Sequence, residues 1–282
     1  MKKIILVLGA TASGKTKKAV EISKQENGEI ISCDSRQIYK YLDIGSNKEG
    51  KLIGESLREI DGISQHLTDI IEPDKTYNAA AFAKDADKKI EEIIERKKVP
   101  VICGGTGLYV KALLYGLDEM PSADEKLRTE LKNKSADELY EKLLTIDPQA
   151  ATKHKGNPQR LMRALEINIL SGKNLKDFFK PTKARYDFTL YNLDTPRDKL
   201  YAKINLRCAK MIKNGMIEET KKVLDMGFSK QCPGLSGIGY KLIIEFLDGK
   251  ISKNKLIEEF SKETRHYAKR QITWFKKNPS AI

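Results

Sequence analysis

Short apolar runs alternate with longer amphipathic stretches over the first 117 residues. Three runs rich in Ile, Val and Leu, each ending in small residues, predict buried strands: 3–10 (KIILVLGA), 29–35 (EIISCDS) and 99–105 (VPVICGG). Three stretches with a helical period predict helices: 15–25 (KTKKAVEISKQ), 79–98 (AAAFAKDADKKIEEIIERKK) and 106–117 (TGLYVKALLYGL). An alternation of this kind is typical of a parallel sheet with crossover helices.

Two long stretches depart from this alternation. Residues 40–76 show no clear period, and a long excursion of this kind is often functional or mobile. Residues 121–185 have the pattern of helices and turns, without a strand. Two helix starts are predicted there because a serine is followed three residues later by a glutamate, at Ser122 (PSADEKL) and Ser135 (SADELYEKLL).

The alternation resumes after this helical stretch. Residues 189–193 (TLYNL) predict a strand, and residues 195–215 (TPRDKLYAKINLRCAKMIKNG) predict a helix. We therefore predict an α/β protein in which residues 1–120 and 186–282 form a parallel sheet core flanked by helices. Residues 121–185 are predicted to be an all-helical insertion domain.

The composition is ordinary for a globular protein. The chain has 282 residues, of which 40% are hydrophobic and 32% charged, and no apolar run approaches the roughly 20 residues of a membrane span. The four cysteines are far apart and form no metal-binding pattern, which indicates a reducing compartment; we expect them to be packing residues. No membrane association and a cytoplasmic location are expected.

Charge is unevenly distributed. Residues 1–120 carry 19 basic and 19 acidic residues, whereas residues 199–282 carry 18 basic and 8 acidic residues. A basic excess concentrated toward one end favours a polyanionic partner larger than a nucleotide. A lysine-rich surface that only improves solubility is the alternative.

GATASGKT, residues 9–16, matches the phosphate-binding pattern GxxxxGK[ST] in full. It stands where the motif requires, between a buried strand and a helix. Backbone N–H groups and the helix N-terminus can hold phosphate oxygens, Lys15 can reach the outer phosphate, and the Thr16 hydroxyl can bind Mg²⁺. The N-terminal MKKIILVLGATA resembles a short secretory signal, but its cleavage would destroy this loop, so we interpret it as the first strand. The fold prediction thereby becomes a P-loop α/β core.

Two further groups are expected at the same sheet edge. Asp34 ends the second predicted strand, and parallel strands present their carboxyl ends to one crevice. It can coordinate a metal or take a proton, although capping a turn is the simpler role for it. Thr106, in the GGTG turn after the third predicted strand, adds a hydroxyl. Together with Lys15, these groups favour group transfer from a diphosphate ester over nucleotide binding alone.

Several segments, in order along the chain, resemble the bacterial tRNA dimethylallyltransferases. They are GATASGKT, IISCDSRQIYKYLDIGSNK, HLTDIIEP, VPVICGGTGLY, NPQRLMRALE and AKRQITW, which extend to Trp274. The resemblance implies that the loop holds dimethylallyl diphosphate and that the prenyl group passes to the exocyclic N6 amine of adenosine 37 in tRNA. The diphosphate-binding residues are then Gly9, Ala10, Thr11, Ala12, Ser13, Gly14, Lys15 and Thr16, with Mg²⁺ as the cofactor on Thr16.

The same resemblance implies the catalytic residues. Asp34 corresponds to the general base of the family, because a poorly nucleophilic aromatic amine is helped by a carboxylate that accepts its proton. Lys15 and Arg207 correspond to cations near the diphosphate, where negative charge grows as the bond breaks. Thr106 completes the catalytic set. Arg207 can also be an ordinary surface arginine of its helix.

The tRNA contacts implied by the resemblance fall on three parts of the chain. The stacked adenosine must be extruded to reach the site, and the residues expected to meet the RNA are Asp34, Ser35, Arg36, Gln37, Thr106, Arg128, Gln159, Arg160, Leu161, Met162, Arg163, Lys269 and Arg270. In the insertion, Leu161, Leu165 and Ile169 are predicted to pack while Arg160 and Arg163 face outward. Lys262, Arg265, Lys269 and Lys276 are predicted to share one helical face, and Trp274 is predicted to be a core residue. Arg36 departs from the methionine common in the family.

Two other functions remain open on the residues alone. A small-molecule kinase would use the loop for ATP and Asp34 as base toward an alcohol, which leaves the basic C-terminal third unexplained. A non-catalytic RNA-binding NTPase leaves Asp34 and the GGTG turn without a role. Whether ATP binds is not decided by the sequence; the protein is expected to act as a monomer.

Overall fold

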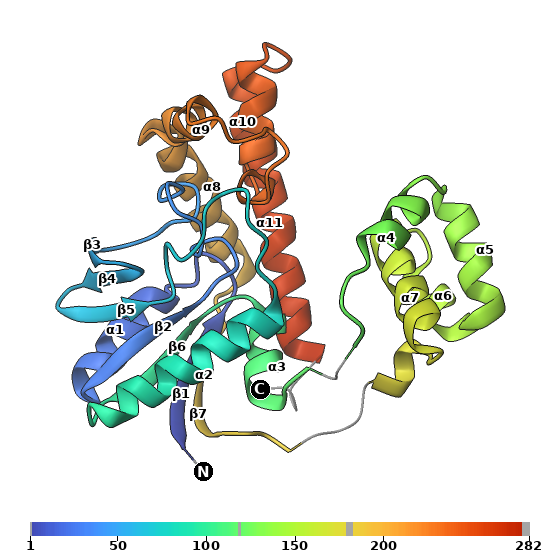
Figure 1. Ribbon diagram of the computed structural model, residues 1–282. Helices are drawn as coiled ribbons and strands as arrows, with labels where there is room; N and C mark the ends of the chain where they lie inside the picture. Colours follow the sequence, from blue (N-terminus) through green and yellow to red (C-terminus); the bar gives the residue numbers. More distant parts are fainter. Residues whose placement is uncertain (1, 118–119, 179–182, 278–282) are drawn as a thin grey trace. The chain divides into compact units, whose positions relative to one another are not determined.

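The computed structural model describes residues 2–117, 120–178 and 183–277. The chain forms two compact units (Figure 1): one consists of Met1–Gly116 with Ala184–Ile282, and the other of Leu117–Lys183. The predicted insertion, 121–185, overlaps the second unit, and its residues 179–182 lie outside the described residues.

The larger unit is built on a seven-stranded sheet. Its strands are β1 (Lys3–Gly9), β2 (Gly28–Cys33), β3 (Lys51–Gly54), β4 (Leu57–Ile60), β5 (Ile63–His66), β6 (Val99–Gly104) and β7 (Asp187–Leu193), in the order β3-β4-β5-β2-β6-β1-β7. The five strands from β5 to β7 in that order are parallel. All four predicted strands are confirmed, and β1 is a buried interior strand.

The aperiodic stretch 40–76 contains three strands that the sequence pattern did not predict. β3, β4 and β5 form an antiparallel meander that extends the sheet beyond β2. Each of these strands has only four residues, and all four residues of β3 are exposed at the sheet edge. A strand this short and this exposed shows no alternation, which is why the hydrophobic pattern did not reveal it.

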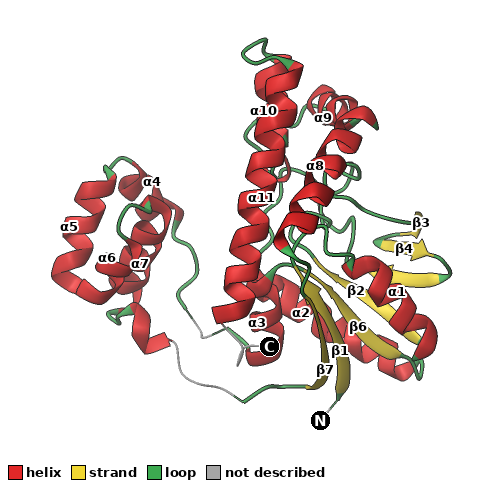
Figure 2. Ribbon diagram, turned by 180° about the vertical axis from the view of Figure 1, so that it is seen from behind, coloured by secondary structure: helices red, strands yellow, loops and turns green. Residues whose placement is uncertain are grey.

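Helices cover both faces of the parallel strands (Figure 2), as the pattern predicted. Alternate residues of β1 point to opposite faces: Ile4, Leu6 and Leu8 pack with α2 (Ala79–Glu95) and α3 (Gly107–Tyr115), whereas Ile5 and Val7 pack with α1 (Lys15–Gln25). Strands buried on both faces are continuously apolar, which explains why β1, β2 and β6 are evident in the sequence.

The C-terminal helices build a second apolar cluster. It involves α8 (Arg197–Lys213), α9 (Met216–Asp225), the short helix η2 (Gly234–Ser236), α10 (Tyr240–Leu247) and α11 (Lys253–Lys277). Ala10, Ile38 and Leu42, which follow the carboxyl ends of β1 and β2, pack into the same cluster. The C-terminal third of the chain therefore lies at the sheet edge where the phosphate loop begins.

The second unit is helical throughout its described part. It contains α4 (Glu125–Lys132), α5 (Ala136–Ile146), α6 (Pro148–His154), α7 (Pro158–Ser171) and the short helix η1 (Leu175–Phe178), around a leucine-rich core of its own. The predicted capping box of Ser135 and Glu138 is confirmed at α5. The predicted cap at Ser122 is wrong, because α4 begins two residues later with Asp124 accepting from the Leu127 N–H.

Two predictions from composition can be compared with the structure directly. All four cysteines are buried free thiols, as expected of packing residues. No helix in the described part of the chain is long and apolar enough to cross a membrane.

A buried acid ties β2 to β5 and to the segment between α2 and β6. Glu29 of β2 accepts from His66 (2.6 Å) and Arg96 (2.7 Å) and pairs with Lys98 (2.9 Å). Burial opposes its charge, but these hydrogen bonds together lower the pKa of Glu29 to about 2. A carboxyl whose pKa is lower in the folded than in the unfolded state stabilises the fold above its unfolded pKa of about 4.3, and this contribution is lost as pH falls toward 2.

We expect the unfolding free energy of the wild-type protein to decline between pH 5 and 3. The decline should be smaller in Glu29→Gln, by on the order of 2 kcal/mol, because the titrating group is gone. Urea unfolding at a series of pH values measures both curves. Parallel curves for the two proteins would show that Glu29 does not carry this linkage.

Candidate active site

The phosphate loop has the backbone geometry of an anion cradle. Gly9 leaves β1 with φ 154°, and a Cβ there would lie 2.8 Å from the Leu193 carbonyl oxygen. Gly14 has φ 92° and stands at the N-terminus of α1, where, within the described residues, no side chain caps the helix. The first N–H groups of α1 are therefore not occupied by a capping side chain, and the helix end favours negative charge.

Cations and unpaired polar atoms surround this loop. Lys15 Nζ donates to the Ala10 carbonyl oxygen at 2.7 Å, and burial lowers the pKa of its ammonium. Arg207 of α8 donates through Nη2 to the Thr11 hydroxyl, and burial lowers the pKa of its guanidinium. In the described part of the chain, Ser13 Oγ and Arg207 Nε are buried without a hydrogen-bond partner. Buried polar atoms of this kind ordinarily have partners, so an oxyanion is the ligand that these groups suit.

Asp34 faces the same cavity from the end of β2. Its Oδ1 accepts from the Arg36 backbone N–H at 2.8 Å, and the Thr106 hydroxyl accepts from the Ser35 backbone N–H at 3.2 Å. Lys15, Asp34 and Thr106 therefore meet at one sheet edge, as predicted. Thr106 is not among the residues that line the cavity, and its hydroxyl supports the backbone beside Asp34. Burial raises the pKa of the Tyr267 phenol, and the nearby Asp34 charge adds to this effect, so Tyr267 is neutral next to the carboxylate.

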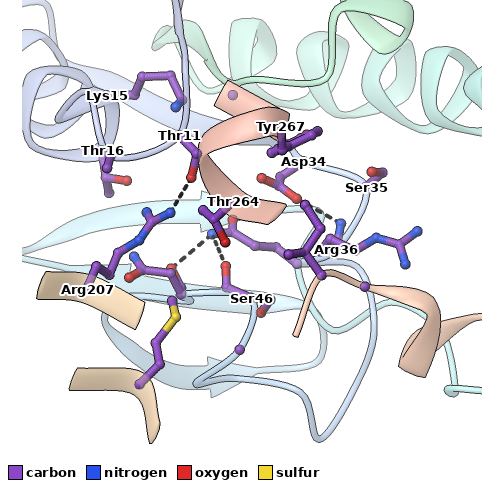
Figure 3. Close-up of a pocket in the computed structure, with 18 of the residues that line it drawn as sticks. Thr11, Lys15, Thr16, Asp34, Ser35, Arg36, Ser46, Arg207, Thr264 and Tyr267 are labelled. Atoms are coloured by element: carbon purple, nitrogen blue, oxygen red, sulfur yellow. Dashed lines mark hydrogen bonds between the residues drawn. The ribbon is translucent and has the colours of Figure 1, made fainter. Parts of the chain in front are cut away.

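The cavity that joins these groups has a volume of about 630 Å³, within the range of roughly 300–1,000 Å³ of small-molecule sites. Figure 3 shows Lys15, Thr11, Thr16 and Arg207 around one part of it and Asp34, Ser35 and Arg36 around another. Its remaining wall includes apolar side chains from three C-terminal helices: Met211, Tyr240 and Phe260. The cavity thus offers an anion cradle, a carboxylate and apolar surface together.

Tyr267 and Gln271 are among the residues of α11 that sequence reasoning missed at this site. Tyr267 lines the cavity beside Asp34, and Gln271 accepts from the Thr11 N–H at 2.8 Å. Both lie within the segment YAKRQITW, and Tyr267, Gln271 and Trp274 have the helical spacing i, i+4 and i+7 that puts them on one face. That spacing was the available signal. It could not indicate that this face meets the phosphate loop.

The family model for IPP transferase matches residues 37–278 of the chain. The chain belongs to this family. A tRNA dimethylallyltransferase of Endomicrobium trichonymphae is 64% identical over 276 residues, covering 98% of this chain and 92% of that protein. A tRNA dimethylallyltransferase of Clostridioides difficile is 42% identical over 291 residues, covering 100% and 91%.

Solved structures agree with this assignment. The tRNA isopentenylpyrophosphate transferase of Bacillus halodurans is 38% identical with a TM-score of 0.71, covering 98% of this chain and 87% of that one. A eukaryotic dimethylallyltransferase acting on tRNA is 27% identical with a TM-score of 0.81, covering 98% and 70%. The IPP transferase core is therefore the predicted P-loop α/β fold, here with an antiparallel extension of the sheet.

The predicted RNA contacts next to Asp34 are partly engaged inside the IPP transferase fold. Arg36 Nη1 donates to the Pro233 carbonyl oxygen (3.2 Å) and to Ser236 Oγ (3.1 Å), so it holds the segment that contains η2. Gln37 accepts from Ser32 Oγ at 2.7 Å and donates to the Asn47 carbonyl oxygen at 3.1 Å. Both side chains therefore shape the wall of the cavity, whatever else they contact.

In the insertion, Glu166 organises two of the predicted RNA-binding arginines. Its side chain is fully buried and accepts from Arg128 Nε (2.8 Å) and Arg163 Nη1 (2.5 Å). Burial opposes the charge of Glu166, but these two arginines and the Asp124 N–H lower its pKa. Arg163 also donates to the Pro121 carbonyl oxygen, so its predicted outward orientation is wrong. Its guanidinium is needed to compensate the buried carboxylate.

The Leu161 side chain packs inward, as predicted, and is therefore not open to the RNA contact that was also predicted for this residue. Leu161 is 0% exposed and belongs to the core of the insertion, whereas Ile169, predicted to pack, is 44% exposed. Packing of Leu165 is confirmed. Gln159 and Arg160 are exposed and Met162 is half-buried. Of the α7 residues predicted to contact RNA, Gln159 and Arg160 in the N-terminal turn are therefore the ones most open to a partner.

The basic face predicted on α11 is present. Lys262, Lys269 and Lys276 are exposed, and Arg265 is half-buried with a hydrogen bond to Asn205. Arg270 is exposed and lines the cavity. Trp274 packs against the core beneath α3, close to Gly107, as predicted. One helix thus carries both the wall of the cavity and a row of surface cations.

Proposed function

We propose that this protein transfers the dimethylallyl group from dimethylallyl diphosphate to the N6 amine of adenosine 37 in tRNA, releasing diphosphate. Membership of the IPP transferase family and the names of its relatives support a tRNA prenyl transfer. The observation that carries the proposal is the cavity in which a phosphate cradle and Asp34 face one space. A kinase needs the cradle and a base as well, but the relatives and the basic C-terminal third favour RNA.

The chemistry requires one bond to form and one to break. The adenine N6 lone pair attacks C1 of the dimethylallyl group, and the C1–O bond breaks with its electron pair leaving on diphosphate. Asp34 accepts the proton that N6 loses. General-base assistance of this kind contributes about 10²–10⁴ in rate. The Arg36 N–H bond to Asp34 Oδ1 orients the carboxylate for this role.

The cradle stabilises the leaving group. Lys15, Arg207 and the N–H groups at the start of α1 surround the position proposed for the diphosphate, and the unpaired Ser13 hydroxyl and Arg207 Nε supply further donors. Donors arranged before the reaction stabilise developing charge without reorganisation. The residues proposed for this role are those of 9–16 together with Arg207.

Mg²⁺ fits the donor set at this position. The Thr16 hydroxyl lines the cavity, and among the described residues no three His, Cys, Asp or Glu side chains cluster to hold a metal. Mg²⁺ commonly keeps several waters and binds through few protein oxygens plus substrate phosphates. Thr16 and the diphosphate would hold the ion, which would neutralise part of the leaving-group charge.

For the RNA, we propose two contact surfaces. One is the exposed face of α11 with Lys269 and Arg270, and the other is the insertion, through the N-terminal turn of α7 with Gln159 and Arg160. An adenosine in an anticodon loop has to leave its stack to reach Asp34. We further propose that the protein works as a monomer in the cytoplasm, where its tRNA substrate is found.

Incubation with radiolabelled dimethylallyl diphosphate, unmodified tRNA and Mg²⁺ tests the activity. Label should appear in the RNA, on the adenosine at position 37 after nuclease digestion, and should be absent from a tRNA with another base there. Transfer of the γ-phosphate of ATP to a small molecule, with no label in RNA, would select the kinase instead.

Replacing Lys269 and Arg270 by glutamate should weaken tRNA affinity and flatten its dependence on salt, because fewer counterions are released when RNA binds. Filter binding between 50 and 300 mM salt measures both quantities. Glutamate at Lys241 and Lys253, exposed lysines of α10 and α11, makes the same change in net charge elsewhere. Equal affinity and slope in the two double variants would assign the 269–270 face to solvent.

A further inference from the structure

The side-chain amide of Gln271 joins two turns at the sheet edge. Its oxygen accepts from the Thr11 N–H at 2.8 Å, and its nitrogen donates to the Gly105 carbonyl oxygen at 2.9 Å. Thr11 belongs to the phosphate loop after β1, and Gly105 to the turn after β6 that leads to Thr106. Gln271 itself is buried in α11, about 260 residues away from Thr11 in sequence.

The orientation of this amide follows from its partners. A backbone N–H requires an acceptor and a backbone carbonyl requires a donor, so exchanging the oxygen and nitrogen of Gln271 would place like groups against each other. The neighbouring Gly105 provides the space, because a Cβ there would lie 2.2 Å from the Gln271 nitrogen. Any larger residue at position 105 would therefore displace the Gln271 side chain.

The peptide unit that Gln271 holds also carries the contact of Lys15. The Thr11 N–H and the Ala10 carbonyl belong to one planar peptide and point in opposite directions. Gln271 binds the N–H, and Lys15 Nζ donates to the carbonyl oxygen at 2.7 Å. The Thr11 side chain in turn accepts from Arg207. A rotation of this single peptide would therefore displace both cations of the cradle.

We propose that Gln271 is a positioning residue that sets the Ala10–Thr11 peptide and, through it, Lys15 and Arg207 for the diphosphate. It touches neither reacting atom. The same helix carries Tyr267 and Arg270 on the cavity wall. Gln271 therefore connects the part of the site proposed to hold the dimethylallyl diphosphate to the part proposed to receive the adenosine. The role in transfer rests on the proposed function, whereas the role in diphosphate binding stands without it.

Two substitutions separate hydrogen bonding from charge and packing. Gln271→Met keeps the length of the side chain and loses both bonds. Gln271→Glu keeps the acceptor but, when ionised, cannot donate to the Gly105 carbonyl; when protonated, its carboxyl group offers the same donor and acceptor as the amide. Gln271→Glu should therefore recover diphosphate binding as pH falls, and Gln271→Met should not.

Calorimetric titration with inorganic diphosphate and Mg²⁺ gives the first readout. We expect the diphosphate Kd of Gln271→Met to rise about tenfold, as for the loss of a hydrogen bond to a cradle-forming group. The Kd of Gln271→Glu should be at least as high at pH 8, and its ratio to wild type should shrink toward pH 5.5. With dimethylallyl diphosphate and tRNA, kcat/KM for the diphosphate should fall while KM for tRNA stays within about threefold.

Gly105→Ala provides an independent variant, because it displaces the Gln271 side chain without changing it. It should raise the diphosphate Kd as Gln271→Met does. Thermal unfolding of all variants accompanies the titrations. Wild-type diphosphate affinity in both Gln271→Met and Gly105→Ala overturns the proposal. A defect confined to Gln271→Glu also overturns it, because it would reflect charge alone. A parallel loss of melting temperature, tRNA affinity and diphosphate affinity assigns Gln271 a purely structural role and also overturns it. If wild type labels no tRNA but the titrations behave as expected, the proposed function fails and this inference stands.

Discussion

Asp34→Ala should lower kcat for dimethylallyl transfer at least about a hundredfold while tRNA still binds. Removing the carboxylate removes the group that faces the cavity and is proposed to accept the proton from adenine N6. Single-turnover transfer of radiolabel to tRNA measures the chemical step directly, and filter binding measures RNA affinity. Near-normal turnover would exclude Asp34 as the base.

Asp34→Asn is the matched control for the structural part of this effect. The amide oxygen can still accept from the Arg36 N–H, so the turn after β2 is preserved, but the amide cannot take a proton. We expect Asp34→Asn to be as slow as Asp34→Ala in the chemical step. If Asp34→Asn had wild-type activity, loss of the hydrogen bond to the Arg36 N–H, and not loss of proton transfer, would explain the low activity of Asp34→Ala.

Lys15→Met should reduce kcat/KM for dimethylallyl diphosphate by about 10²–10³, the range found when one donor to a developing charge is removed. Its tRNA affinity should change less than about threefold. Lys24→Met, at the other end of α1, removes an equal charge from an exposed position and should remain near wild type. Equal activity of the two variants would contradict the assignment of Lys15 to the diphosphate.

The burial of Lys15 also predicts that diphosphate affinity depends on pH. Burial lowers the pKa of its ammonium in the free protein, and a bound diphosphate restores the charged form. The bound state therefore holds its proton more tightly, so diphosphate affinity should weaken as pH rises through the pKa of free Lys15. Diphosphate itself also loses protons over this pH range. The plot of diphosphate affinity against pH for Lys15→Met is therefore the reference, and only the wild-type protein should show an additional loss of affinity.

Much of the core was predictable because each signal is local. β1, β2 and β6 are continuous apolar runs since helices bury both of their faces, and the phosphate loop needs its glycines because Gly9 and Gly14 adopt backbone angles that other residues rarely take. Asp34 could be placed at the cavity from its position at the end of a parallel strand. These statements need only the neighbours of each residue in the chain.

The insertion shows where local reasoning stops. The period of α7 identifies Leu161 and Leu165 as inward residues, but Glu166, fully buried and charged, is one residue further on. Arg163 reaches Glu166 from the same helix, at positions i and i+3, whereas only the packing of α4 against α7 brings Arg128 to it. Arg128 comes from another element, so the helical pattern of α7 could not assign it to Glu166.

The sequence by itself determined the parallel strands β1, β2, β6 and β7, the phosphate cradle and the carboxylate at the strand end, because periodicity and backbone angles are properties of short segments. Tertiary structure alone decided that α11 closes the cavity, that Tyr267 neighbours Asp34 and that Gln271 holds the Thr11 peptide. These contacts join residues more than 200 positions apart. Which face of a helix meets which turn depends on how all the apolar surfaces pack at once, and no segment of the chain carries that information alone.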